Sequence, residues 1–491
     1  MRVVLACAFV AALCSVAESN GRPPATSTIN FQKGNSQNIV AGMTFGVLFS
    51  SDGGKTWTWM CEDAFPYSGM FDPVYAYTQS GALFATTFSG LKVMRDGCSF
   101  NLTSVGVDYM SNVIAGSGSN IFATASAPTD STIFASTDDG SSFAPQAMPG
   151  LPDDYWQSYV IAPSDPTRVY LTGYRFVKEC DENSANQGSA CNVNSNCTAS
   201  GSNMPKCQTT KIFLMFRSDD GGSNFAPISQ AGLTASQNSA ISVVGVDPAN
   251  PDAVYIHVNF ETDAGGDGVY KSFTAGGSGS ADGSAWTKVL DMQDPTGLVM
   301  LVRSNGALVA ATETMGAMSS AGGSACTSQA SCAWTPMANA PHINCLAEDP
   351  TSKDVWACTQ NYGNGSNIPS DGAGIMKTSD LATWTPMLKF SDIAGPVMCG
   401  SDTLQAQQCV APYMGMPSVW CCLVQQLGIT STAVDCTGAN ACLMGGDDSG
   451  SGSGSGSGPG KSGCCNTGGG GAGALLLGVV TGLFVYRRRR R

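Results

Sequence analysis

The stretch that decides the fold is Ser50-Ser51-Asp52-Gly53-Gly54-Lys55-Thr56-Trp57, because its order of hydroxyl, aspartate, glycine and aromatic returns along the chain. Two further complete copies span residues 136–143 and 218–225. Two degenerate copies keep the same order, one at 95–100 without the leading hydroxyl and one at 378–384 without the glycine. The residues that define the motif are Asp52, Gly54, Trp57, Asp138, Gly140, Phe143, Asp220, Gly222, Phe225, Asp380 and Trp384.

Each residue type in this motif has a structural role in a β-hairpin turn. The aspartate carboxylate accepts backbone N–H bonds across the turn, and the serine or threonine hydroxyl ties the base of the turn. Glycine supplies the positive φ that the turn demands. The aromatic residue begins the next strand and packs inward between sheets. We therefore expect carboxylates that are used by backbone hydrogen bonds rather than placed for chemistry.

A second pattern lies upstream of some copies and reads as strand, turn, strand. An Asp-Pro pair fixes the direction of the chain in a turn, and such a pair sits between two short apolar runs in residues 162–170, 246–255 and 348–356. In other repeats a pair of glycine with serine or asparagine takes its place, at residues 80–81, 118–119 and 305–306. Together the two patterns define a unit of four antiparallel strands.

The units can be counted by the aromatic residues that close them, which are Trp57, Phe100, Phe143, Phe225, Trp286, Trp334 and Trp384. Four antiparallel strands in each unit are typical of a propeller blade. The sequence therefore predicts an all-β fold, a seven-bladed β-propeller over residues 28–392. The first unit lacks a strand before Ile39, so we expect the two ends of the propeller to close the ring by sharing a blade.

The repeats resemble those of the Asp-box (BNR-type) families, which include sialidases, sortilin-type receptors, xyloglucan-cleaving glycosidases and photosystem assembly propellers. The resemblance covers the whole stretch of repeats and implies a propeller fold. It is weak for function, because one fold carries many unrelated activities.

Composition excludes one class of partner. Only 12% of the residues are charged and the net charge is -13. Binding of nucleic acid needs clustered Lys and Arg to neutralise phosphates, and the only basic cluster is the run of arginines at 487–491. We expect no nucleic-acid partner and no cofactor.

Cysteines are abundant, and their pattern favours disulfides over metal. The chain has 20 cysteines, two histidines and no Cys-x-x-Cys pair, so we predict no zinc or iron–sulfur site. A cysteine-rich insert at 179–208 lacks apolar residues for a core of its own, and six cysteines crowd the segment 393–445. We expect disulfides to hold the insert together and to make 393–445 a small module after the propeller.

Both ends of the chain read as targeting segments. Residues 1–17 combine Arg2, an apolar run and small residues before Ala17, which is typical of a signal peptide. A flexible Ser/Gly linker spans 446–463, and residues 464–491 contain Cys464, Cys465, a short apolar stretch and five arginines.

The last of these segments resembles the sorting tag of myxobacterial surface proteins. The resemblance implies cutting or lipidation at Cys464 or Cys465 and a place on the outer surface of a Gram-negative cell. A plain single-pass membrane anchor is the alternative. In either case we expect an exported, membrane-attached protein.

Residues suited to catalysis are sparse. A sialidase needs three arginines to grip a carboxylate, and no Arg-Ile-Pro signature is present. A glycosidase needs two carboxylates that face each other, and nothing in the sequence brings a pair together. We expect both histidines, His257 and His342, to be structural, and residues 263–268 to form a plain turn rather than a calcium site. The candidate acids outside the turn motifs are Asp153, Asp154, Glu261, Asp263 and Glu313, which we expect to be solvated loop residues.

The sequence thus favours a binding or scaffold protein over an enzyme. The expected ligand is a protein, a peptide or a glycan held at the mouth of the central channel. Aromatic residues on loops are the candidate contacts, namely Tyr67, Tyr155, Trp156 and Tyr362. A diverged glycoside hydrolase, similar to a sialidase or a xyloglucanase, is the alternative.

Overall fold

A computed structural model gives the architecture of the chain. It places the propeller within one compact unit, Pro24–Ala439. The residues that it describes are 23–65, 72–126, 131–180, 207–260, 267–274, 286–292, 298–323, 326–363, 368–412, 418–431 and 433–436. The predicted signal peptide with Ala17, the predicted linker and the predicted tail with Cys464 and Cys465 lie outside them. No helix among the described residues is long and apolar enough to cross a membrane.

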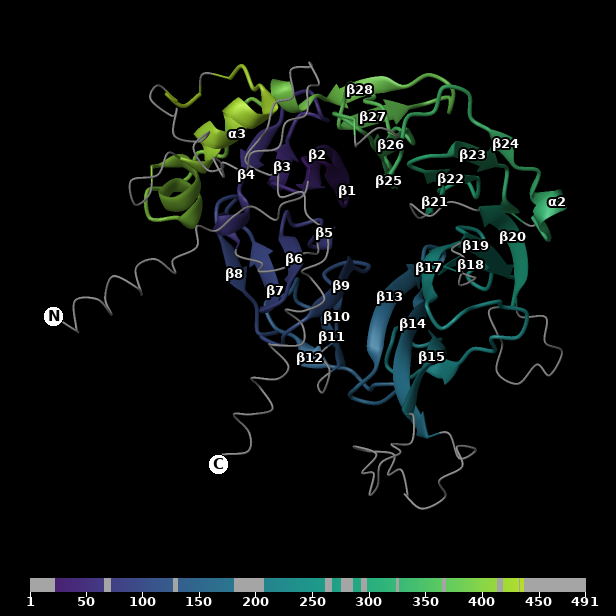
Figure 1. Cartoon of the computed structure of the whole chain (residues 1–491). Helices are drawn as coiled ribbons and strands as arrows, with labels where there is room; N and C mark the ends of the chain where they lie inside the picture. Colours follow the sequence, from purple (N-terminus) through teal and green to yellow (C-terminus); the bar gives the residue numbers. More distant parts are fainter. Residues whose placement is uncertain are drawn as a thin grey trace, which may run out of the picture. The chain divides into compact units, whose positions relative to one another are not determined.

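Seven antiparallel sheets of four sequential strands surround a central axis (Figure 1), as the repeats predict. The strands of the first four blades are β1 (Thr26–Gln32), β2 (Asn35–Met43), β3 (Gly46–Ser50), β4 (Thr58–Met60), β5 (Tyr75–Tyr77), β6 (Leu83–Thr87), β7 (Gly90–Met94), β8 (Phe100–Leu102), β9 (Met110–Ala115), β10 (Ile121–Ala125), β11 (Thr132–Ser136), β12 (Ala144–Pro145), β13 (Tyr155–Ala162), β14 (Asp165–Cys180), β15 (Cys207–Ser218) and β16 (Ala226–Pro227).

The last three blades repeat the same order from the axis outward. Their strands are β17 (Ala240–Val246), β18 (Val254–Asn259), β19 (Asp267–Ser272), β20 (Thr287–Met292), β21 (Val299–Val302), β22 (Leu308–Thr312), β23 (Gly316–Ser320), β24 (Thr335–Pro336), β25 (Cys345–Glu348), β26 (Val355–Cys358), β27 (Ile375–Thr378) and β28 (Thr385–Leu388). The first strand of each blade contacts the first strand of the next, and β1 contacts β25, so the ring is complete.

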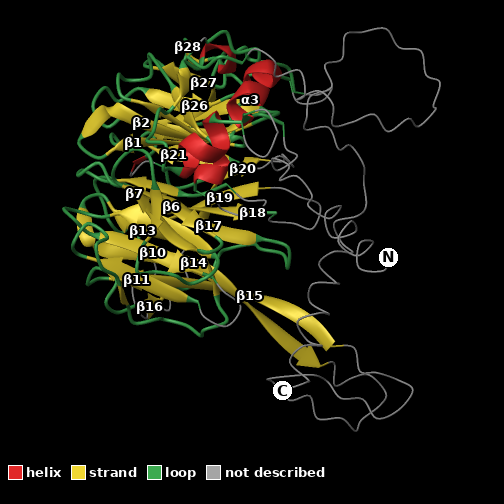
Figure 2. Cartoon of the chain, turned by 90° about the vertical axis from the view of Figure 1, so that its left-hand side faces the viewer, coloured by secondary structure: helices red, strands yellow, loops and turns green. Residues whose placement is uncertain are grey.

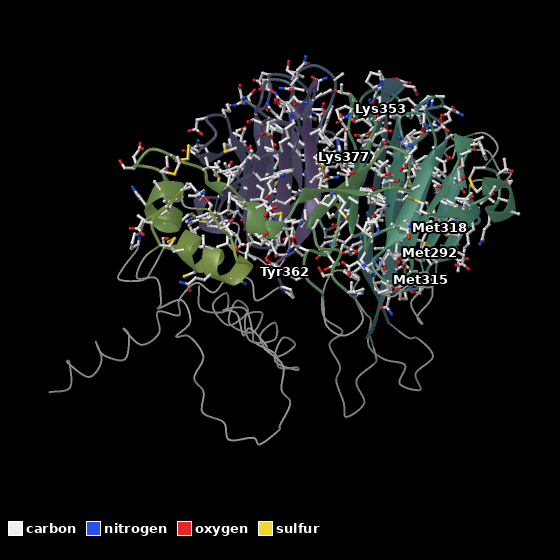
Figure 3. All side chains as sticks on the ribbon, turned by 90° about the horizontal axis from the view of Figure 1, so that it is seen from above. Met292, Met315, Met318, Lys353, Tyr362 and Lys377 are labelled. Carbon is white, nitrogen blue, oxygen red and sulfur yellow. A yellow bond between two sulfur atoms is a disulfide. The ribbon has the colours of Figure 1, made fainter. Side chains whose placement is uncertain are left out.

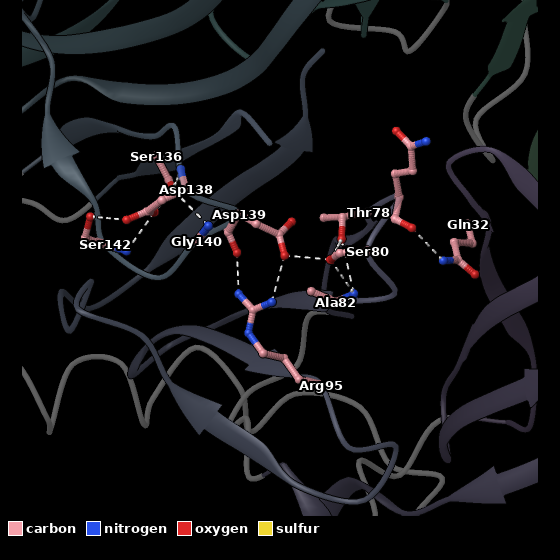
Figure 4. A network of polar contacts seen from close by, with 11 residues as sticks. Gln32, Thr78, Ser80, Ala82, Arg95, Ser136, Asp138, Asp139, Gly140 and Ser142 are labelled. Carbon is pink, nitrogen blue, oxygen red and sulfur yellow. Dashed lines mark hydrogen bonds and ion pairs between the residues drawn. The ribbon is translucent and has the colours of Figure 1, made fainter. Parts of the chain in front are cut away.

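The Ser-x-Asp-x-Gly turns have the hydrogen bonds that their residues predict. In the first blade, the Asp52 carboxylate accepts the N–H groups of Lys55 and Thr56, both at 3.0 Å. The Ser50 hydroxyl donates to Asp52 at 2.8 Å and accepts the Gly54 N–H at 2.9 Å. The same arrangement recurs around Asp138, Asp220 and Asp380. Figure 4 shows the turn of the third blade. These carboxylates are therefore used by the backbone.

The glycine of the turn also meets the preceding blade. Gly54 has a φ of +85°, and a Cβ there would lie 2.6 Å from the ring of Trp356 in the last blade. Gly140 has a φ of +76°, and its Cβ would lie 2.2 Å from Phe84 of the second blade. A side chain at either position would be strained by its backbone and blocked by an aromatic ring.

Three of the closing tryptophans connect their blade to the one before it by a hydrogen bond. The Trp57 indole donates to the carbonyl of Met387, across the junction between the first and last blades, at 3.0 Å. The Trp286 and Trp334 indoles reach back one blade in the same way, to Ser229 at 2.8 Å and Val289 at 2.7 Å. All seven closing aromatics begin or directly precede the fourth strand of a blade, so the predicted blade count is confirmed.

The expectation that the ends share a blade is wrong. Residues before Ile39 form β1, so the first blade takes all four strands from one continuous stretch. The short strand β29 (Gly395–Pro396), which follows the last blade, instead pairs in parallel with β4 of the first blade. The chain from Gly395 onward, which we name the later segment, therefore folds back over the junction between the first and last blades, which we name the seam.

This later segment is fixed to the first two blades by covalent bonds and by packing. Disulfides join Cys61 to Cys409 and Cys98 to Cys399. The buried Gln405 amide donates to the Trp59 carbonyl at 3.1 Å, and the rings of Trp59 and Trp420 lie 5.5 Å apart. The helical elements among the described residues are η1 (Glu62–Ala64), α2 (Gln329–Cys332), η3 (Phe390–Asp392), η4 (Gln405–Val410) and α3 (Val419–Leu427).

Three further disulfides are described, Cys326–Cys332, Cys345–Cys358 and Cys421–Cys436. The last of these lies within the segment after the propeller. In the insert at 179–208, Cys180 and Cys207 are register partners of β14 and β15, and residues 181–206 lie outside the described residues.

Removing the turn carboxylate is expected to destabilise the propeller in a pH-dependent way. Hydrogen bonds from the Ser142 hydroxyl and N–H and from Ser136 lower the pKa of Asp138 to about 2. An unfolded aspartate titrates at about 3.9, so the ionised carboxylate stabilises the fold above that pH, and the effect is lost as the pH falls through about 2. Asp138→Ala should lower the Tm at pH 7, and its difference from the wild type should shrink toward pH 2. The exposed Asp108→Ala is the control; an equal loss in both variants would contradict the turn's role.

Removing the disulfide between distant residues is expected to cost more stability than removing a local one. Cys98 and Cys399 are 301 residues apart, whereas Cys326 and Cys332 are 6 apart. With the Cys61–Cys409 bond intact, the Cys98–Cys399 bond still closes a loop of about 47 residues, since 37 separate Cys61 from Cys98 and 10 separate Cys399 from Cys409. A longer loop restricts the unfolded chain more, so Cys98→Ser with Cys399→Ser should lower the free energy of unfolding by about 2–4 kcal/mol. Denaturant titration of this pair against Cys326→Ser with Cys332→Ser measures the difference. Equal losses would show that the Cys98–Cys399 bond stabilises the fold no more than the local Cys326–Cys332 bond does.

Candidate functional site

The two faces of the propeller disc are chemically different. Because antiparallel strands alternate in direction, alternate connections emerge on the same side. We name one side the turn face, which carries the Ser-x-Asp-x-Gly turns and the connections from first to second strands. The other is the hairpin face, which carries the connections from second to third strands, such as residues 44–45 and 313–315, and the links between blades. Figure 2 shows α3 and the extended ends of β14 and β15 on the same side of the disc.

Ion pairs dominate the turn face. Several join neighbouring blades, including Arg95 with Asp139 at 2.7 Å and Arg303 with Glu348 at 3.1 Å. Figure 4 shows that Arg95 reaches the turn of the third blade, where Ser80 of the second blade also donates to Asp139. Polar groups on this face are thus largely paired within the protein.

Large apolar side chains instead gather on the hairpin face. Met315 is 59% exposed, Phe176 48% and Tyr362 40%. Figure 3 shows Met315 and Tyr362 on one side of the disc and Lys353 on the other. Exposed large apolar residues on loops or strand ends of the hairpin face are Tyr109, Leu151, Phe176, Ile212, Phe260, Met315 and Tyr362. Singly exposed apolar residues are usual on protein surfaces, whereas contiguous apolar patches are typical of binding sites.

The densest part of this surface is an aromatic ladder on the fourth blade, formed by Tyr155, Tyr174 and Phe176. The Tyr155 and Tyr174 rings stack at 5.0 Å with an interplanar angle of 6°. Phe176 meets both rings edge-on, at 5.8 and 5.2 Å. The Lys211 ammonium lies 4.3 Å from the centre of the Tyr174 ring. Stacked rings flanked by a cation form a rigid amphipathic platform.

An ion pair between Arg175 and the buried Asp154 holds the strand that carries the ladder. The Asp154 carboxylate is fully buried and receives the Arg175 guanidinium, with Nη2 at 2.8 Å. It also accepts the Leu151 N–H at 2.7 Å. Arg175 lies between Tyr174 and Phe176 in β14, so its pairing fixes the strand that carries both rings. The expectation that Asp154 is a solvated loop acid is wrong, because the strand extension of β14 brings a cation to it.

The histidines are held by aspartates in a similar way. His257 Nε2 lies 2.8 Å from Asp267, whose carboxylate also accepts the N–H groups of Phe260 and Leu298. His342 Nδ1 lies 2.8 Å from Asp371, which also accepts the Gln360 N–H. Each aspartate thereby ties loops together, and these contacts are structural.

The remaining candidate acids are dispersed. Asp153 is exposed, and Glu313 accepts a hydrogen bond from the Gln360 amide at 3.2 Å. Glu261, Asp263 and residues 264–266 of the considered calcium turn lie outside the described residues, whereas Gly268 belongs to β19. Within the described part of the chain, no three His, Cys, Asp or Glu side chains are grouped to hold a metal ion.

Each arginine within the described ranges pairs with an acidic side chain of the protein. Their partners are Asp139 for Arg95, Asp219 and Asp252 for Arg168, Asp154 for Arg175, Asp219 for Arg217, and Glu348 for Arg303. They also lie on both faces of the disc. A cluster of three arginines that grips a substrate carboxylate is not formed by these residues.

The aromatic residues predicted as contacts have different positions. Tyr155 is part of the ladder, whereas Trp156 is only 2% exposed and packs inside against Phe216. The Tyr362 ring is exposed, but its hydroxyl donates to the Leu427 carbonyl at 2.7 Å. Tyr67 lies outside the described residues.

Sequence reasoning missed Tyr174, Phe176 and Lys211. A signal was present, because Tyr174 and Phe176 are two residues apart and therefore share one face of a strand. It became readable only with β14 extended to Cys180, because Tyr174 then pairs with Tyr155 at the end of β13 and Phe176 lies beyond that strand.

Solved structures with similar folds include enzymes and other propellers. The GH74 xyloglucanase from Xanthomonas campestris is 11% identical, with a TM-score of 0.36, and the match covers 74% of this chain and 58% of the xyloglucanase. YCF48 bound to D1 peptide is 9% identical, with a TM-score of 0.40 and coverage of 74% and 92%. A GH74 enzyme from Niastella koreensis is 15% identical, with a TM-score of 0.28 and coverage of 74% and 65%. No family model and no curated protein matches the chain. At these identities function must be argued from the chain's own residues.

Proposed function

We propose that this protein is a non-enzymatic binding module that holds an extended peptide or glycan against its hairpin face. The observation that carries this proposal is the aromatic ladder of Tyr155, Tyr174 and Phe176 with Lys211 beside it. Rigid aromatic side chains provide contact area at a low cost in conformational entropy, and they are enriched at binding sites. The burial of Asp154 under the ladder holds the strand in place before a ligand arrives.

The acids and arginines support binding rather than hydrolysis. Asp154 and Glu313 are already bound by Arg175 and Gln360, and every described arginine pairs with an acid. A glycosidase needs two carboxylates free to act as acid and as base or nucleophile. A ligand on this face would therefore meet aromatic and amide groups rather than a paired acid and base.

The proposal includes export and attachment to the outer cell surface, which rest on the terminal segments of the sequence. A Ser/Gly linker is flexible by composition and would let the propeller move relative to its point of attachment. The abundant disulfides of the propeller suit an oxidising compartment.

Truncating the ladder is expected to abolish ligand binding while the fold persists. The purified protein is screened on a glycan microarray and against a random peptide library, and the ligands it selects are titrated by calorimetry. Phe176→Ala should weaken binding at least about tenfold, as expected for an aromatic contact residue. Met398→Ala, which truncates a 70% exposed apolar residue of the later segment, is the control. Unchanged affinity in Phe176→Ala, or release of reducing ends from xyloglucan or sialic acid from sialosides, would overturn the proposal.

Removing the tail cysteines is expected to release the protein from the membrane. If Cys464 or Cys465 is the site of processing or lipidation, the variant Cys464→Ser with Cys465→Ser should lose its surface attachment in a Gram-negative host. Fractionation and protease shaving of intact cells measure this. The single variants separate the roles of the two cysteines. A double variant that stays on the membrane would support a plain membrane anchor.

A further inference from the structure

A cavity of about 330 Å³ opens on the turn face between the fifth and sixth blades. Its wall combines the Asp-Pro turn that follows β17, the end of β19, and the turn between β21 and β22. The lining residues are Asp247, Pro248, Ala249, Asn250, Ala253, Lys271, Phe273, Ser304, Asn305, Gly306 and Gly323. The hairpin face and its aromatic ladder lie on the other side of the disc.

Lys271 is the only cation that lines this cavity, and it is almost completely buried, with 1% of its surface exposed. Its ammonium donates to the Gly323 carbonyl and lies 4.3 Å from the centre of the Phe273 ring and 4.8 Å from that of Tyr255. Among the described residues no carboxylate lies within ion-pair distance of it. Burial lowers the pKa of Lys271 to about 8, and the more distant Asp247 opposes this shift.

The equivalent cations of other blades have an acidic partner. Arg217 stands directly before the turn serine of the fourth blade and pairs with Asp219 at 3.0 Å. Lys377 occupies the same place in the last blade and pairs with Asp354 at 3.1 Å. In the fifth blade Phe273 stands two residues after Lys271, at the place that Asp219 takes relative to Arg217, so this carboxylate partner is missing. A buried ammonium without an anion beside it costs free energy, and an anionic ligand would remove that cost.

We propose that this cavity binds a small hydroxylated carboxylate, of about the size of a hexuronic acid, with its carboxylate on Lys271. The size follows from the cavity volume. The rest of the wall is polar and suits a ligand with several hydroxyl groups. The Asp247 carboxylate can accept hydrogen bonds from hydroxyls, and the Asn250 and Asn305 amides can both donate and accept them. Phe273 offers an apolar surface for the C–H groups of a sugar ring. This site goes beyond the ligand face proposed above and does not depend on it.

Ligand binding at this site should depend on pH through Lys271. Asp247 and Tyr255 are the other titratable groups that act on it, and the wall from the sixth blade is uncharged. The ammonium form binds the carboxylate, so affinity is present below about pH 8 and falls above it. Glucuronate is ionised throughout this range and contributes no change of its own.

The test uses the full chain with D-glucuronate as the probe and D-glucose as its neutral counterpart. Glucuronate should raise the Tm at pH 6.5 more than glucose does, and this excess should disappear at pH 9.5. Lys271→Met should weaken glucuronate binding at least about tenfold, because it removes a charge-assisted hydrogen bond. Lys377→Met, at the equivalent position of the last blade, should leave it within about twofold. Equal effects of glucose and glucuronate, or unchanged binding in Lys271→Met, would overturn the proposal.

A second variant keeps the test decisive if Lys271→Met does not fold. Asn305→Asp retains the oxygen that accepts the Ala307 N–H at 3.0 Å but adds a negative charge to the cavity wall. It should weaken glucuronate binding and leave the response to glucose unchanged.

Discussion

The rest of the structure depends on one constraint, which is that the first blade must pack against the last. In this chain the junction is made by side chains of the repeat motif itself. The Trp57 indole donates to the Met387 carbonyl, Phe31 meets Trp356 edge-on at 5.5 Å, and Gly54 leaves room for the Trp356 ring. The same residues that shape a local turn therefore close a ring over more than 300 residues, with the Cys61–Cys409 bond spanning 348.

This constraint also separates the two faces by chemistry. The turns and their ion pairs must hold neighbouring blades together, so their polar groups are occupied and the turn face is largely satisfied. The hairpin face has fewer of the described ion pairs, and its loops and strand ends expose Phe176, Phe260 and Met315. The cavity at Lys271 fits the same reasoning. It lies in a blade where Phe273 takes the place of Asp219, so the buried ammonium of Lys271 has no carboxylate partner among the described residues.

The fold could be predicted in detail because its signals are local. A turn such as Ser50–Asp52–Gly54 specifies its own hydrogen bonds, and a closing aromatic specifies where the fourth strand begins. The seam could not be predicted, because the pairing of Gly395 with Thr58 joins residues far apart in sequence. The burial of Asp154 was missed for the same reason: its partner, Arg175, lies 21 residues away on a strand whose length the sequence does not mark. Trp156 is buried whereas its neighbour Tyr155 is partly exposed, because adjacent strand residues face opposite sides of a sheet.

The sequence by itself determined the number of blades, the turns and the use of their carboxylates, since each of these depends on residues within one repeat. Tertiary structure alone decided the way the ring closes, the partner of each buried charge and the composition of each face. These properties depend on which side chains of different blades meet, and that is fixed only when the blades pack around a common axis. The cavity at Lys271 belongs to this second group, because its wall comes from two blades. The ladder at Tyr174 lies within one blade, but it forms only when β13 pairs with the extended β14.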